Sequence, residues 1–216
     1  MKKFNGYLFD LDGTLVDTAP DIGAALNKVL TNQHLPQADN SLVRHWVGHG
    51  ARTLITKSLD HFDQTAGELQ IDDMLQEFRT YYSEHLAVFS QPYPTVVETL
   101  RQLKNSGCAL AVVTNKLAEF SQPLLEQLEL ADYFSLLVAG DTLPVSKPAA
   151  EPALYACEHL KVPPEQTLFI GDSAADVGCA RAAGCSIVCM RDGYNHGTPA
   201  DELGADQVIT LMSELL

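Results

Sequence analysis

The segment Phe9-Asp10-Leu11-Asp12-Gly13-Thr14-Leu15 joins a short apolar run, residues 7–9, to a glycine turn. The run has the composition of a buried strand, and side chains two residues apart on a strand point to the same face. Asp10 and Asp12 can therefore face one crevice where the strand gives way to the turn. Two carboxylates at such a short distance raise each other's pKa unless a cation lies between them. Because Mg²⁺ typically takes one or two carboxylates together with substrate phosphate, the spacing predicts either a magnesium site or a surface turn with two solvated acids.

Apolar strands alternate with helices in the second half of the chain. The pattern predicts strands at residues 109–113, 136–139, 167–170, 186–190 and, more weakly, 207–209, with helices at 96–104, 120–128, 151–160 and 174–183. Continuous apolar strands that alternate with helices are typical of a parallel sheet covered on both faces. We therefore predict an α/β fold that also contains the opening strand.

Residues 18–86 show helical periodicity only. The sequence Thr18-Ala19-Pro20-Asp21 has the form of a helix start, with a hydroxyl at the N-cap, a proline in the first turn and an acid at the third helical position. Gly48-His49-Gly50 interrupts the helical pattern, and the prolines of residues 91–94 suit a semi-rigid hinge. The chain is therefore predicted to consist of an α/β core, residues 1–17 and 88–216, and an all-helical insert, residues 18–87.

The overall charge excludes two classes of partner. A formal net charge of −14 argues against nucleic acid or an anionic membrane as the main partner, because both require a basic face. The five cysteines form no CxxC pair and lie mostly in apolar segments, which favours reduced thiols in the core. We expect a cytoplasmic monomer or homodimer with no signal peptide and no membrane-spanning segment.

Three of the apolar strands end in reactive polar residues. Asp10 and Asp12 follow the first strand, Thr114 follows residues 109–113, and Asp172 follows residues 167–170. In open α/β sheets, ligands bind beyond the carboxyl ends of the strands. Lys147 adds a cation, and Asp176 lies one helical turn after Asp172. A carboxylate nucleophile with Mg²⁺ and a lysine to neutralise phosphoryl oxygens indicates phosphoryl transfer, and the sequence contains no nucleotide-binding P-loop.

Four motifs resemble, in order and approximate spacing, those of the phosphatases of the haloacid dehalogenase (HAD) superfamily. They are Asp10-Leu11-Asp12-Gly13-Thr14-Leu15, Val113-Thr114-Asn115, Lys147-Pro148 and Gly171-Asp172-Ser173-Ala174-Ala175-Asp176. The resemblance covers essentially the whole chain. It implies a Rossmann-like parallel-sheet core, with the helical insert as a cap domain of the C1 type.

The resemblance also implies a role for each motif residue. Asp10 would attack phosphorus, and Asp12 would protonate the leaving oxygen and then activate the water that hydrolyses the aspartyl-phosphate. Thr114 and Lys147 would bind the phosphoryl oxygens. Mg²⁺ would be bound by the Asp10 carboxylate, by the Asp172 carboxylate and by the backbone carbonyl of Asp12. Asp176 would not bind the metal directly but would orient Lys147 or metal-bound water.

Within the superfamily, the chain is most similar to bacterial phosphoglycolate phosphatases. The similarity is carried by Trp46-Val47-Gly48-His49-Gly50-Ala51, Thr114-Asn115-Lys116 and Gly193-Tyr194-Asn195-His196-Gly197. It implies a substrate site formed by Thr114, Asn115, Lys147, Gly48, His49 and Arg52. Arg52 could bind a substrate carboxylate through two hydrogen bonds, or it could be a solvated helix residue.

The sequence departs from this subfamily at two places. His49 stands where the cap loop usually carries asparagine, and Ala149-Ala150 follows Lys147-Pro148 where histidine or aspartate and proline are usual. Neither position belongs to the phosphoryl chemistry, but either could affect substrate choice. The alternatives are an N-acetylmuramic acid 6-phosphate phosphatase, a broad sugar-phosphate phosphatase, a phosphoglucomutase-like isomerase, or a non-catalytic module on the same fold.

Overall fold

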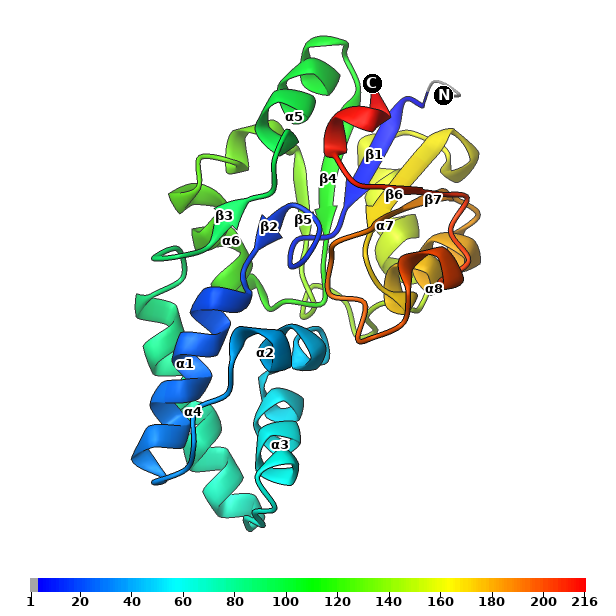
Figure 1. Cartoon of the computed structure of the whole chain (residues 1–216). Helices are drawn as coiled ribbons and strands as arrows, with labels where there is room; N and C mark the ends of the chain where they lie inside the picture. The colour runs from blue at the N-terminus through cyan, green and yellow to red at the C-terminus, as the bar shows by residue number, and fades with distance from the viewer. Residues whose placement is uncertain (1–3) are drawn as a thin grey trace.

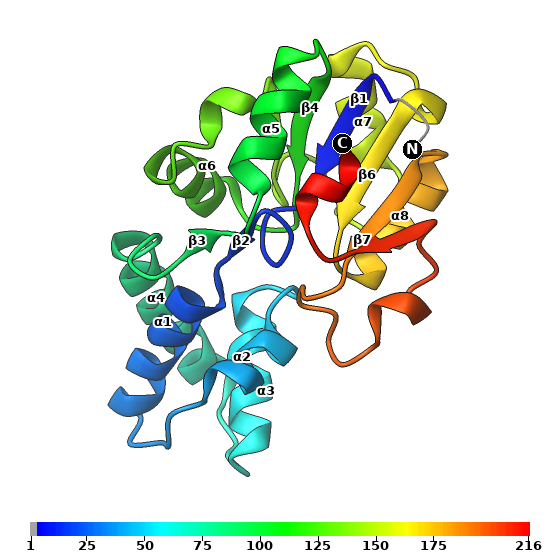
Figure 2. The ribbon, with the colours of Figure 1, turned by 45° about the horizontal axis from the view of Figure 1, so that its top comes forward.

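A six-stranded parallel sheet forms the centre of the protein, as Figure 2 shows for the computed structural model, which describes residues 4–216. The strand order is β5-β4-β1-β6-β7-β8. The bounds are Gly6–Phe9 for β1, Ala109–Val113 for β4, Leu136–Val138 for β5, Thr167–Gly171 for β6, Ser186–Met190 for β7 and Gln207–Ile209 for β8. This sheet confirms the predicted α/β fold. Phe9 at the end of β1 is in register with Val112 and Ile170, so the residues that follow these three strands emerge at one edge.

Four helices cover the two faces of the sheet. They are α5 (Val96–Asn105), α6 (Ala118–Gln127), α7 (Glu151–Leu160) and α8 (Ala174–Ala183), and short 3₁₀ turns lie at Ala131–Tyr133, Pro164–Gln166, Ala200–Glu202 and Met212–Leu215. Side chains alternate along β1: Tyr7 and Phe9 join the apolar cluster that includes α5 and α6, whereas Leu8 joins the cluster of α7 and α8. Burial on both faces explains why the strands read as continuous apolar runs.

A second group of helices lies beyond the carboxyl ends of the strands (Figure 1). It consists of α1 (Ala19–Asn32), α2 (Asn40–Trp46), α3 (Ala51–His61) and α4 (Glu68–Glu84), in which α1 and α3 both pack against α4. The chain enters and leaves this group through two short antiparallel strands, β2 (Val16–Asp17) and β3 (Gln91–Pro92). The start of the predicted proline hinge, residues 91–92, is thus one strand of a two-stranded ribbon. The division of the chain into domains at residues 17 and 88 stays a prediction. Within residues 4–216, no helix combines the length and the apolar composition needed to cross a membrane.

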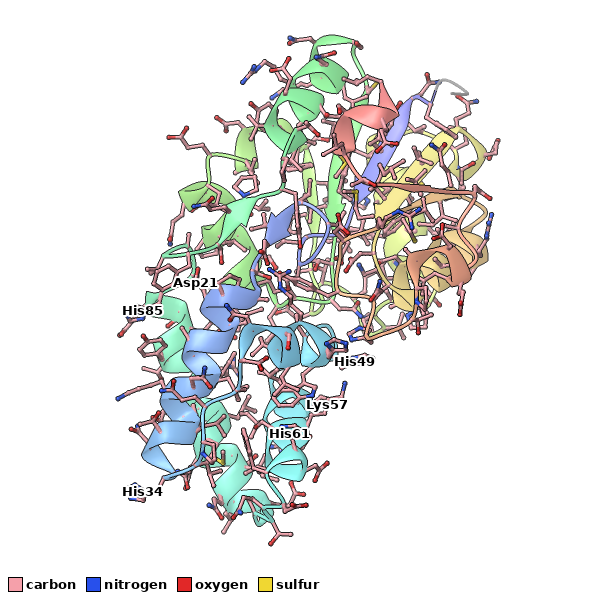
Figure 3. The ribbon with its side chains drawn as sticks, in the orientation of Figure 1. Asp21, His34, His49, Lys57, His61 and His85 are labelled. Carbon is pink, nitrogen blue, oxygen red and sulfur yellow. The ribbon has the colours of Figure 1, made fainter. Side chains whose placement is uncertain are left out.

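The start of α1 differs from the predicted helix cap. The hydroxyl of Thr18 donates a 2.7 Å hydrogen bond to Oδ1 of Asp12 and caps no helix amide. The carboxylate of Asp21 (Figure 3) accepts hydrogen bonds from the backbone N–H groups of Phe89 and Ser90 and from the Ser90 hydroxyl. Thr18 therefore connects α1 to the end of β1, and Asp21 connects it to the returning chain at residues 89–90.

We expect Leu8→Ala to reduce the free energy of unfolding by about 2–5 kcal/mol, because the Leu8 side chain is fully buried between β1 and α7–α8 and its loss would leave a cavity. The measurement is a urea denaturation curve followed by circular dichroism. The matched control is Leu69→Ala on α4, where the leucine is 82% exposed and the change should stay within about 0.5 kcal/mol. Equal effects of the two substitutions would contradict the assignment of Leu8 to the core.

Candidate active site

Asp10 and Lys147 form a buried ion pair at the carboxyl end of β1. The backbone N–H of Asp10 donates to the carbonyl of Ile170 on β6, which fixes the strand end. Nζ of Lys147 lies 2.7 Å from Oδ1 of Asp10. Burial raises the pKa of Asp10 to about 6, although the neighbouring ammonium acts in the opposite direction. Asp10 is thus a buried carboxylate whose charge depends on the cation beside it.

Lys147 is held from three sides. Its ammonium lies 2.6 Å from Oδ1 of Asp176 and donates to the carbonyl of Val113 at 2.8 Å, in addition to its contact with Asp10. Burial alone would lower the pKa of Lys147, but the two carboxylates hold it above its usual value. The Asn115 side chain exchanges two 3.0 Å hydrogen bonds with the Lys147 backbone. In this structure Asn115 therefore positions Lys147, and its predicted contact with substrate stays a prediction.

Asp172 and Asp176 approach Asp10 from β6 and the first turn of α8. Oδ1 of Asp172 accepts a 2.8 Å hydrogen bond from the Thr14 hydroxyl, and Oδ2 accepts one of 2.5 Å from the backbone N–H of Tyr194. Oδ2 of Asp176 accepts from the N–H groups of Asp172 and Ser173 and from the Ser173 hydroxyl. Asp176 thus uses both oxygens within the protein, and its predicted role in orienting Lys147 stays a prediction.

These three acids have the properties of a divalent-cation site. One carboxylate oxygen from each of Asp10, Asp172 and Asp176 lies within 4.8 Å of the others. Burial, Asp176 and Asp10 together raise the pKa of Asp172 well above its usual value, so the carboxylates repel one another. Among residues 4–216, no hydrogen bond of suitable geometry reaches Oδ1 of Asp10. A hard cation with oxygen ligands fits this donor set, and the oxygens of Asp10 and Asp172 have more capacity to bind it than those of Asp176.

Asp12 lies beside a second buried lysine that the sequence prediction did not place in the site. Nζ of Lys116 lies 3.0 and 3.2 Å from the two Asp12 oxygens and donates a 2.8 Å hydrogen bond to the hydroxyl of Tyr82 on α4. Only 6% of the Lys116 side chain is exposed. Burial would lower the pKa of Lys116, but Asp12 and Tyr82 hold it above its usual value. Lys116 follows Thr114 by two residues, and this closeness to a motif residue could have identified it. The helical periodicity around Tyr82 indicates only a residue of the hydrophobic core.

The loop between α2 and α3 reaches the same site from the helical side. His49 lies at the end of this loop that faces the core (Figure 3), and its ring centroid is 4.5 Å from that of His196. Arg52 pairs with Glu68 at 3.2 Å and with Asp72, both on α4, and its side chain is 45% exposed. Arg52 is therefore an exposed helix residue that pairs with two carboxylates of α4, and its predicted contact with substrate stays a prediction.

A cavity of about 310 Å³ brings both sides together. Its lining includes, from the core, Asp10, Asp12, Thr114, Lys116, Lys147 and Asp172, and from the helices, Gly48, His49, Arg52 and Tyr82. The cavity has two buried ammonium groups in its wall, one beside Asp10 and one beside Asp12. Each ammonium is paired with a carboxylate that also lines the cavity.

Comparison with known proteins agrees with this geometry. The family model described as haloacid dehalogenase-like hydrolase matches residues 7–190. The phosphoglycolate phosphatase of Nitrosococcus oceani is 41% identical over 219 residues, covering 100% of this chain and 96% of that protein. The phosphoglycolate phosphatase of Haemophilus influenzae is 40% identical and covers 96% of this chain and 95% of that protein. A crystal structure described as a predicted phosphoglycolate phosphatase from Haemophilus somnus superimposes with a TM-score of 0.94 at 36% identity, covering 100% of this chain and 97% of that one. The chain therefore belongs to the haloacid dehalogenase-like hydrolase family, as the resemblance of its motifs predicts.

Proposed function

We propose that this phosphatase hydrolyses 2-phosphoglycolate to glycolate and phosphate, with Mg²⁺ as its metal and an aspartyl-phosphate on Asp10 as its intermediate. The observation that carries the proposal is the pair of buried lysines in one small cavity, since 2-phosphoglycolate has a phosphate at one end and a carboxylate at the other. The phosphoglycolate phosphatases that share about 40% identity over nearly the whole chain support the same substrate.

The phosphoryl group would bind at the end of β1. A carboxylate oxygen of Asp10 attacks phosphorus as the bond from phosphorus to the ester oxygen breaks. Lys147, fixed by Asp176 and the Val113 carbonyl, offsets the charge of the phosphoryl oxygens, and the Thr114 hydroxyl can donate to one of them. Mg²⁺ held by Asp10, Asp172 and the backbone carbonyl of Asp12 would supply further charge neutralisation. Water then attacks the aspartyl-phosphate and regenerates Asp10.

Asp12 would act as general acid and then as general base. Its oxygens accept hydrogen bonds from the Lys116 ammonium and from the Thr18 hydroxyl. A substrate carboxylate that binds Lys116 would compete with Asp12 for the ammonium, so that Asp12 could take up a proton from solvent and pass it to the leaving oxygen. The carboxylate of the substrate would thus release Asp12 from Lys116 before the proton transfer. Phosphate esters that carry no second anion would not do this.

The helical segment, residues 18–87, would serve as the cap over this cavity. A volume of about 310 Å³ lies near the lower end of the range of roughly 300–1,000 Å³ that small-molecule sites occupy. This size favours a two-carbon ester over N-acetylmuramic acid 6-phosphate. The buried thiols of Cys157, Cys179, Cys185 and Cys189 support a reducing, cytoplasmic location, and the oligomeric state, monomer or homodimer, stays a prediction.

The first test is phosphate release from 2-phosphoglycolate, N-acetylmuramic acid 6-phosphate, hexose phosphates and p-nitrophenyl phosphate, each with Mg²⁺ or with EDTA. We expect kcat/KM for 2-phosphoglycolate to exceed the others about a hundredfold, equivalent to about 2.7 kcal/mol of discrimination. EDTA should abolish the release and added Mg²⁺ should restore it. A profile that favours sugar phosphates would contradict the substrate, and slow release stimulated by a sugar bisphosphate would indicate the isomerase instead.

Asp10→Asn should abolish turnover while preserving the fold, because the amide is a poor nucleophile of nearly the same size. The measurements are phosphate release and the thermal unfolding midpoint. The control is Asp63→Asn, an exposed acid on the helical side where asparagine tolerates the positive φ of 54°, and it should retain full activity. Residual turnover above a few per cent in Asp10→Asn would exclude Asp10 as the nucleophile.

Lys116→Met should raise KM for 2-phosphoglycolate about 10- to 100-fold relative to KM for p-nitrophenyl phosphate, as expected for the loss of one charged hydrogen bond. Loss of the pair between Lys116 and Asp12 acts on the protonation step and so on kcat, whereas the ratio of the two KM values reports the carboxylate contact. Arg52→Met is the matched comparison, since Arg52 also lines the cavity. A selective effect of Arg52→Met with none for Lys116→Met would assign the carboxylate to Arg52.

A further inference from the structure

Tyr194 occupies a position that the proposed chemistry does not use. It lies in the loop after β7, only 3% of its surface is exposed, and it contributes to the cavity wall. Its backbone N–H donates to Oδ2 of Asp172, as described above. Its ring packs so close to the turn after β1 that a Cβ atom on Gly13 would lie 2.9 Å from Tyr194 Cγ. The backbone of Tyr194 is thus held at the carboxylate of Asp172 by this hydrogen bond.

The phenol end of Tyr194 reaches the connection to the helical cap. Its hydroxyl donates a 2.5 Å hydrogen bond to Oδ1 of Asp17 on β2 and accepts a 2.8 Å hydrogen bond from the backbone N–H of Ala19, the first residue of α1. The other Asp17 oxygen pairs with Arg44 on α2, and the Arg44 guanidinium lies 5.4 Å from the centroid of the Tyr194 ring. One hydroxyl therefore bridges the core loop, the connecting strand and the first cap helix.

The same loop contacts the cap at a second point. Nδ1 of His196 lies 3.2 Å from the carbonyl of His45 at the end of α2, and its ring packs against that of His49. A Cβ atom on Gly48 would lie 2.9 Å from Cε1 of His196, so the cap loop and this core loop touch closely. The loop after β7 therefore contacts the cap helices directly, and Tyr194 is the buried residue of this contact.

We propose that Tyr194 is a positioning residue that holds the cap closed over the cavity through Asp17 and Arg44 while its backbone orients Asp172. This proposal rests on the proposed function for its kinetic consequence, because a small substrate gains from closure only if the cap encloses it. When the hydroxyl is absent, the closed state loses the bond to Asp17 and the acceptor for the Ala19 amide. Substrate must then bind to a protein that is closed for a smaller fraction of the time.

The test is Tyr194→Phe, which keeps the ring and the backbone N–H. We expect KM for 2-phosphoglycolate to rise about tenfold, equivalent to about 1.4 kcal/mol, with kcat changed less than about twofold because the core groups are intact. Asp17→Asn should show a similar effect, and the double variant should be no worse than either single one, because both act through the same contact. The control is Tyr155→Phe on α7, which removes a phenol hydroxyl from a ring outside the cavity lining and should leave KM unchanged.

An independent readout is amide hydrogen exchange in the protein without substrate. Exchange at Ala19 should accelerate about tenfold or more in Tyr194→Phe because its acceptor is lost, whereas exchange at Ile22, which donates to the Thr18 carbonyl, should be unchanged. Unchanged exchange at Ala19 would overturn the proposal whatever the substrate proves to be. Fully additive effects of Tyr194→Phe and Asp17→Asn on KM would overturn it as well. Failure of the proposed function would appear separately, as wild-type protein that releases no phosphate from 2-phosphoglycolate.

Discussion

The balance of charge at the carboxyl end of β1 is the constraint on which the site depends. Asp10, Asp172 and Asp176 are buried within a few ångströms of one another, and Lys147 is the ammonium that touches two of them. Such a cluster is costly unless each charge has partners, because burial penalises every ionised group. The hydrogen bonds from Thr14, Ser173 and the Tyr194 backbone satisfy oxygens of Asp172 and Asp176, and the remaining negative charge makes the site receptive to a divalent cation.

The second lysine extends the same principle to helices α1–α4. Lys116 is buried between the carboxylate of Asp12 and the hydroxyl of Tyr82 on α4. These helices therefore line the cavity and also supply a hydrogen-bond acceptor to one of its two buried ammonium groups. Because the Asp12 oxygens accept from both the Lys116 ammonium and the Thr18 hydroxyl, the position of the acid depends on where α1 and α4 lie.

Sequence reasoning predicts the parts of this structure that follow from local patterns. The apolar runs at β4 and β7 have the predicted bounds, because a parallel sheet buries both faces of its strands, and helix α7 also has its predicted bounds. Asp10, Thr114, Lys147 and Asp172 line one cavity because the strands that precede three of them end at one edge. Partners distant in sequence could not be predicted in this way. Asp21 bonds to Ser90, 69 residues later, and Tyr194 reaches Asp17, while β2 and β3 have two residues each and show no alternation.

The ribbon of β2 and β3 has a consequence for the evolution of this architecture. Val16 lies opposite Pro92, so the chain leaves the core and returns to it at neighbouring points. A segment whose ends are adjacent can be exchanged for a longer, shorter or differently folded one without moving the strands that carry the carboxylates. The carboxylates at the end of β1 and β6 lie outside this segment, whereas His49, Arg52 and Tyr82 line the cavity from within it, and the ribbon is the junction between the two parts.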